Sequence, residues 1–205
     1  MSTARTARKV SAKKRSTLGR LGVAACLAFL VLTLSFISSL WAASPDALEN
    51  EVKAAMIFNF TKFVDWPAAS LADSKAPFVV GLVGEDDLTP FVEAAMRDKS
   101  VAGHPVRCVR MQAQHPSESC QLLLVAKSER KRGAEILRMW QRPGLLSISA
   151  MDGFVGLGGV IGIVVEDKRA RFEVNIDAAH RAGLNISSKL LRLARNVQER
   201  TGGGL

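Results

Sequence analysis

The stretch GGVIGIVVEDKRARFEVNIDAAHRAGLNISSKLLRLARNV, residues 158–197 of the 205-residue chain, decides the fold. Residues 160–166 form an apolar run rich in β-branched side chains, and apolar and polar side chains alternate over residues 170–176, so both segments predict strands. Only a short polar segment at Asp167 and Lys168 separates them. Two strands joined in this way predict a β-hairpin.

Two helices are expected after the hairpin. Asp177 is placed to cap a short helix that Gly183 would end, and Ser187 or Ser188 is placed to cap a second one. In the second helix an apolar stripe recurs at helical spacing and is expected to pack on the sheet; it comprises Ile186, Leu190, Leu193, Ala194 and Val197. The expected partner-binding surface of this helix consists of Lys189, Leu191, Arg192 and Arg195.

The net charge of +9 comes mostly from the N-terminus. Seven basic residues precede residue 21 with no acidic residue among them: Arg5, Arg8, Lys9, Lys13, Lys14, Arg15 and Arg20. Without those seven, the other 21 basic residues face 19 acidic ones, which leaves a net charge of about +2. The charge therefore gives no reason to expect a nucleic-acid partner.

An uncharged segment, residues 21–41, follows the basic one and leads to small residues at 42–44. This order predicts a secretory signal peptide over residues 1–43 and an exported domain over residues 44–205. The apolar run approaches the length that crosses a bilayer, so an uncleaved N-terminal anchor remains the alternative. Either arrangement places the domain in the periplasm.

The rest of the chain predicts a single α/β domain with a mixed β-sheet flanked by helices. Helices are expected over residues 47–63, 88–97 and 127–140, and strands over residues 78–84, 106–111, 120–126 and 145–150. A glycine-rich segment, residues 151–159, runs from one strand into another. A phosphate-binding loop leads into a helix, so these glycines are interpreted as turn residues.

Two cysteines remain in the exported domain, Cys108 and Cys120. An even number in an oxidising compartment predicts a disulfide between them, and two separate buried thiols are the alternative. The sequence offers no catalytic, cofactor-binding or metal-binding set of residues. His104, His115 and His180 form no known motif, and Asp152 has no nucleophile or base beside it in the sequence. The chain is therefore not expected to be an enzyme.

Three segments, in this order, resemble the YfiR family of exported proteins. They are EVKAAMIFNFTKFVDWP at 51–67, CQLLLVAKSE at 120–129, and the longer segment from SISAMDGF to LARNV at 147–197. The family usually has a tyrosine near Ile57 and Phe58, and this chain contains none.

The resemblance implies a periplasmic α/β protein without enzymatic activity. Studied relatives bind the periplasmic part of an inner-membrane diguanylate cyclase and repress it, and an outer-membrane lipoprotein sequesters the repressor. By analogy this chain would lower cyclic-di-GMP, control biofilm formation and form a homodimer. A second disulfide of relatives cannot form here, because residues 121–205 contain no cysteine.

Two other functions stay open at this stage. One is a periplasmic small-ligand sensor or binding module that feeds a membrane receptor or kinase. The other is an exported enzyme whose catalytic residues come together only in the folded chain.

Overall fold

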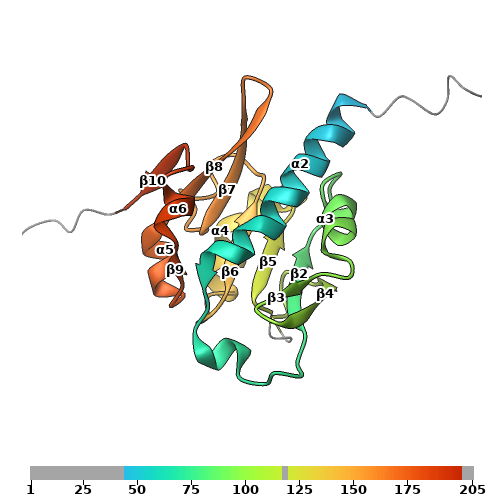
Figure 1. Cartoon of the computed structure of the whole chain (residues 1–205). Helices are drawn as coiled ribbons and strands as arrows, with labels where there is room; N and C mark the ends of the chain where they lie inside the picture. Colours follow the sequence, from blue (N-terminus) through green and yellow to red (C-terminus); the bar gives the residue numbers. More distant parts are fainter. Residues whose placement is uncertain (1–43, 117–119, 200–205) are drawn as a thin grey trace, which may run out of the picture. The chain divides into compact units, whose positions relative to one another are not determined.

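A mixed β-sheet carries the fold in the computed structural model, which describes residues 44–116 and 120–199 (Figure 1). The described part of this sheet has eight strands. In sheet order they are β10 (Asn196–Gln198), β8 (Arg169–Asn175), β7 (Ile161–Glu166), β6 (Leu146–Ser149), β5 (Leu122–Val125), β2 (Phe78–Val83), β4 (His104–Met111) and β3 (Ser100–Val101).

The five central strands, from β4 to β7, run parallel to one another. At one side β8 turns back antiparallel to β7, and β10 is added parallel to β8. At the other side β3 pairs antiparallel with β4. Strands β2, β5 and β6 are buried at every residue, as expected for parallel strands that are covered on both faces.

Helices cover both faces of the sheet (Figure 1). One face, called here the α2 face, carries α2 (Pro45–Phe60), α3 (Thr89–Met96), α5 (Ile176–Arg181) and α6 (Ser188–Leu191), which share one hydrophobic core. The opposite face, called the α4 face, carries α4 (Gly133–Met139) and a second core around Ile136 and Trp140. The single-domain α/β prediction is confirmed for the described residues, and the predicted leader at 1–43 lies outside them.

Shorter elements complete the chain. The 3-10 turns are η1 (Thr61–Phe63), η2 (Ala68–Leu71) and η3 (Lys127–Arg132), and a small second sheet pairs β1 (Val64–Asp65) with β9 (Asn185–Ile186). This small sheet joins the end of the first helix to the chain that follows α5.

The predicted hairpin is present as β7 and β8, with Val165 opposite Ala170 and Ile163 opposite Phe172. Asp167 and Lys168 both have positive φ angles, 49° and 59°, as a two-residue hairpin turn that follows the strand twist requires. The glycine-rich connection also behaves as predicted, because it joins the parallel strands β6 and β7 through turns alone. At Gly159 a Cβ atom would lie 2.2 Å from the ring of Phe154, so the buried ring can pack only against a residue without a side chain.

The predicted second C-terminal helix is wrong in its extent. Helix α6 ends at Leu191, and the N–H of Arg195 then donates to the carbonyl of Phe172 at 2.8 Å, which starts the pairing of β10 with β8. An open sheet edge supplied hydrogen-bond partners that helical spacing does not reveal. Ile186 and Leu190 are buried as predicted, whereas Leu193 is 67% exposed.

One local prediction also changes. Asn175, not Asp177, caps α5, because its side-chain oxygen accepts from the N–H of Ala178 at 2.8 Å. The buried residues of α2 are Lys53, Ala54, Ile57 and Phe60. Several sides of this helix are apolar, and a buried Lys53 is tolerated because it pairs with Glu49 at 2.5 Å.

Candidate functional site

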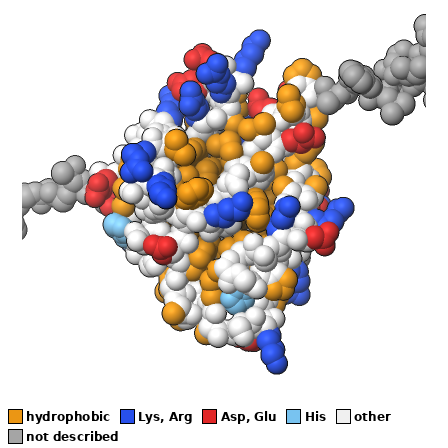
Figure 2. Space-filling model, viewed as in Figure 1, with side chains coloured by type: hydrophobic (Ala, Val, Ile, Leu, Met, Phe, Trp, Pro, Cys, Tyr) orange, Lys and Arg blue, Asp and Glu red, His pale blue; other side chains and the backbone are white. Residues whose placement is uncertain are grey.

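Large hydrophobic side chains remain exposed on the α2 face, where Figure 2 shows them over the β7–β8 hairpin between α2 and α6. We call this group the apolar surface. It comprises Val165 of β7, Leu193 after α6 and Val197 of β10, which are all exposed. Scattered exposed apolar residues are ordinary, but a group contributed by several elements to one face is typical of an interaction site.

The strand register explains why the hairpin contributes to this surface. Ile161, Ile163 and Val165 alternate along β7 and point to the α2 face, and the first two are buried. Helix α2 covers the inner half of the hairpin, where the rings of Phe60 and Phe172 lie 4.9 Å apart. The strand extends beyond this cover, which leaves Val165 45% exposed.

The four predicted partner-binding residues fall into three groups. Lys189 of α6 and Arg192 are exposed, and Arg192 directly precedes Leu193 of the apolar surface in the chain. Arg195 is engaged within the chain, because its guanidinium lies 3.4 Å from Glu166 and 3.7 Å from Glu173. Leu191 is half-buried and packs against the core of the α2 face.

Leu193 and Val165 were missed as surface candidates. Helical periodicity assigned Leu193 to the core, and the apolar run of β7 predicted a strand without indicating where its cover ends. The rapid change from apolar residues to Glu166 and Asp167 was the available signal that β7 reaches solvent at this end.

The predicted disulfide between Cys108 and Cys120 is corrected by the structure, in which the two residues are not joined. Cys108 of β4 packs against the core of the α2 face, whereas Cys120 belongs to the core of the α4 face. The sheet therefore separates the two sulfur atoms. Burial, helped by the negative charge of Glu93, raises the pKa of the Cys108 thiol to about 11.

In open α/β sheets, ligands bind beyond the carboxyl ends of the strands where the strand order reverses. Here that position lies between β2 and β5, and Asp86 fills it with contacts inside the chain. One oxygen accepts from the N–H groups of Leu88 and Thr89, and the other accepts from the N–H of Lys127 at 2.8 Å. Asp86 belongs to the acidic segment 85–87 that follows β2. Its hydrogen bonds connect the loop after β2 to the loop after β5, so its role is structural.

The remaining sequence candidates lie apart from one another. His104 is buried and its Nδ1 lies 2.9 Å from the carbonyl oxygen of Ala76, whereas His180 is exposed on α5. Asp152 is exposed and lies 3.5 Å from Arg130. The part of the chain that the structure describes contains no group of three His, Cys, Asp or Glu residues able to hold a metal ion. Among the described helices, none has the length and apolar character needed to cross a membrane.

Comparison with known proteins identifies a family. The YfiR/HmsC-like family matches residues 50–195, which include the hairpin and most of the apolar surface. Similar solved structures include a conserved domain protein from Vibrio cholerae O1 biovar El Tor, with 11% identity over 59% of this chain and a TM-score of 0.48. Another is an ABC domain in complex with L-Trp from Streptococcus pneumoniae, with 11% identity over 58% of this chain and a TM-score of 0.42. The alignments cover 55% of each of those two chains.

Proposed function

The chain belongs to the YfiR/HmsC-like family, and from this membership we propose that it is a periplasmic regulatory protein. It binds the periplasmic part of an inner-membrane diguanylate cyclase and represses it, so that its presence lowers cyclic-di-GMP. The match over residues 50–195 is the observation that carries this proposal, because it spans nearly all of the described domain.

The apolar surface is the region of the domain that fits such a contact. The centre of a protein–protein interface is apolar and its rim is polar. Val165 and Leu193 supply exposed apolar area, and Lys189 and Arg192 supply positive charge. The matching region of the cyclase would be apolar with an acidic border.

The four residues predicted from sequence take different roles in this proposal. Lys189 and Arg192 contact the partner directly. Arg195 holds β10 against the hairpin through Glu166 and Glu173, and Leu191 supports the surface from beneath. Arg195 and Leu191 are therefore positioning residues.

The same proposal includes export of the chain, its sequestration by a lipoprotein and its assembly into a homodimer. The leader at 1–43 directs the domain to the periplasm, an outer-membrane lipoprotein sequesters it there, and the chain forms a homodimer. Cell fractionation and the N-terminal sequence of the mature protein test export. Recovery of the protein with outer membranes only when the lipoprotein is present tests sequestration.

Deletion of the gene followed by complementation tests repression. Deletion is expected to raise cyclic-di-GMP, and the wild-type chain is expected to restore the lower level. The double variant Val165→Glu with Leu193→Glu should fail to restore it, because two charges would be placed at the centre of the contact. Met139→Glu is the matched control, because Met139 is an exposed hydrophobic residue of α4 on the opposite face.

Thermal unfolding and periplasmic abundance of each variant must match the wild type before the comparison is made. An unchanged cyclic-di-GMP level in the deletion strain would contradict cyclase repression. Full restoration by the double variant would instead remove the apolar surface from the proposed contact and leave the function standing.

A further inference from the structure

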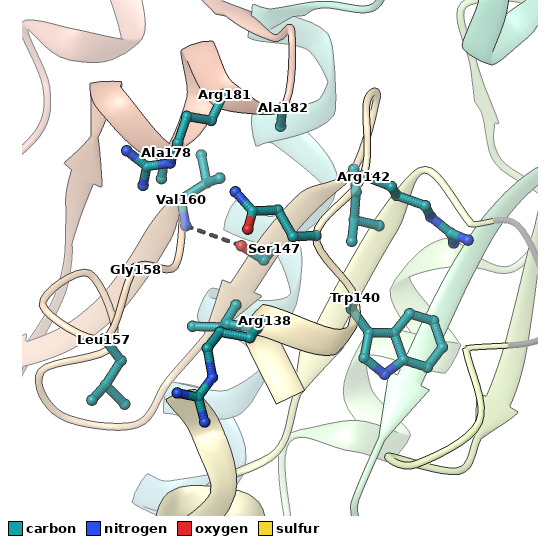
Figure 3. Close-up of a pocket in the computed structure, with 13 residues that line it drawn as sticks. Arg138, Trp140, Arg142, Ser147, Leu157, Gly158, Val160, Ala178, Arg181 and Ala182 are labelled. Atoms are coloured by element: carbon teal, nitrogen blue, oxygen red, sulfur yellow. Dashed lines mark hydrogen bonds between the residues drawn. The ribbon is translucent and has the colours of Figure 1, made fainter. Parts of the chain in front are cut away.

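A cavity of about 200 Å³ lies where the last turns of α4 and α5 approach the amino ends of β6 and β7 (Figure 3). Its apolar wall includes Leu145 before β6, Val160 before β7 and Ala178 of α5. The glycine-rich connection closes one side with Leu157 and Gly158. None of the residues of the apolar surface lines this cavity.

The charged side chains that line the cavity, among the described residues, are all positive. Arg138, Arg142 and Arg181 line it, and no aspartate or glutamate among the described residues does. Arg142 is held in place, because its Nη2 donates to the carbonyl oxygen of Cys120 at 3.3 Å. In Figure 3 Arg138 and Arg181 lie on the side of Leu157 and Gly158, opposite Arg142 and Trp140. Both are exposed, and neither carries an ion pair with an acidic side chain of the described residues.

A buried hydroxyl group adds a neutral donor. Ser147 of β6 is 5% exposed and lines the cavity, and its oxygen accepts from the N–H of Val160 at 3.0 Å (Figure 3). A serine hydroxyl has one hydrogen to donate besides the bonds that its oxygen accepts. That hydrogen is available to an oxygen atom of a ligand in the cavity.

We propose that this cavity binds a small organic carboxylate with an apolar body. The carboxylate lies among the arginines, where charge-assisted hydrogen bonds are strongest, and the body packs against Leu145 and Val160. An apolar cavity of ~150 Å³ accommodates benzene, so the volume here suits a ligand of about the size of benzoate. Ligand binding at this site does not depend on the cyclase contact.

Another explanation of the arginines predicts a different result. Arg138 and Arg181 lie in the last turns of their helices, where positive charge is favourable without any ligand. A purely structural role requires no preference for an anion in the cavity. Binding of a matched pair of probes therefore separates the two explanations.

Benzoate and benzamide are such a pair, because they share size and shape and differ in charge. We expect the exported domain to bind benzoate with a Kd on the order of 1 mM, as is usual for a ligand of this size. Benzamide should bind at least tenfold more weakly. Titration followed by the indole N–H signal of Trp140 in nuclear magnetic resonance spectra reports on the cavity, because Trp140 lines it.

The double variant Arg138→Gln with Arg181→Gln should weaken benzoate binding at least tenfold. Arg97→Gln with Arg171→Gln is the control, because it removes the same charge from exposed arginines that do not line the cavity. Loss in the first variant and retention in the control would support the site. Equal binding of benzoate and benzamide, or equal loss in both variants, would overturn it. Retained benzoate binding in Val165→Glu with Leu193→Glu would distinguish this site from the proposed cyclase contact.

Discussion

Strands β2 and β7 have the same length and a similar apolar composition, and they differ in what covers them. Every residue of β2 is buried between the two helical layers, whereas β7 is buried over its first three residues and reaches solvent over its last two. The covered strand contributes to stability alone. The partly covered strand has an exposed apolar side chain at its outer end, Val165, which belongs to the surface that we propose as the partner contact.

The largest difference between the two strands is expected in stability. Phe78 of β2 is fully buried, and its ring packs edge to face with Trp66 at 5.0 Å. Phe78→Ala should lower the free energy of unfolding by about 3–5 kcal/mol, because it removes a buried ring and leaves a cavity. Val165→Ala on β7 should cost less than about 0.5 kcal/mol, as exposed substitutions usually do.

Urea unfolding of the two variants measures both values. Similar losses in the two strands would contradict the comparison, because they would mean that the outer end of β7 is covered in solution.

The connection into β7 should show the next largest effect. At Gly159 a methyl group would meet the ring of Phe154, which is itself buried in the core of the α4 face. Gly159→Ala should destabilise the domain by about 1–3 kcal/mol through overpacking. Gly153→Ala is a contrasting variant, because no atom lies within 4 Å of its added Cβ and only its φ of 73° is unfavourable.

Urea unfolding also separates these glycine variants. A smaller loss for Gly159→Ala than for Gly153→Ala would show that the Phe154 ring moves aside, so that close packing does not fix the connection.

Burial on the α2 face can also be measured through Cys108 on β4, next to β2. Its pKa of about 11 in the folded chain lies above the ordinary value of 9.0, mainly because burial disfavours the thiolate. The folded chain therefore binds the proton more tightly than the unfolded chain. The stability that the folded chain gains from this tighter proton binding is fully present below pH 9 and is lost as the pH rises toward 11.

At pH 8 the thiolate fraction of Cys108 should be about a hundredfold below that of an unperturbed thiol. A thiolate with a higher pKa is the stronger nucleophile, which offsets part of this difference. Alkylation of Cys108 should therefore be about tenfold slower than alkylation of an unperturbed thiol. Mass spectrometry of the Cys108 peptide, with and without urea, measures the ratio. Recovery of a peptide that joins Cys108 to Cys120 would contradict the separation of the two residues by the sheet.

The sequence predicted the elements that local patterns determine, and it failed for features that depend on how distant strands are arranged. The hairpin, the buried strands and the turn character of the glycine-rich connection were predictable, because local patterns determine them. The end of α6 at Leu191 was not, since it depends on the open edge of β8, which no local pattern contains. The separation of Cys108 from Cys120 depends on strand order and faces, which cysteine spacing cannot show.

The candidate surface shows the same division. Lys189 and Arg192 were found from their charge, whereas Leu193 was assigned to the core by a helical period that the chain abandons after α6. The arginine-lined cavity draws on α4, α5 and the glycine-rich connection, which are distant in sequence. Only the fold brings them together.

The smallest expected effect concerns the edge of the hairpin. Arg195 lies close to Glu166 and Glu173, and all three groups are accessible to solvent, so Arg195→Gln should lower the free energy of unfolding by only about 0.2–1 kcal/mol. Its local effect should be larger, because this pair of contacts holds the short β10 beside β8. Hydrogen exchange should accelerate at Arg195, whose N–H bonds to Phe172, and remain unchanged in β2. Unchanged exchange at Arg195 would show that backbone pairing alone holds β10, and the proposed positioning role of Arg195 would then be excluded.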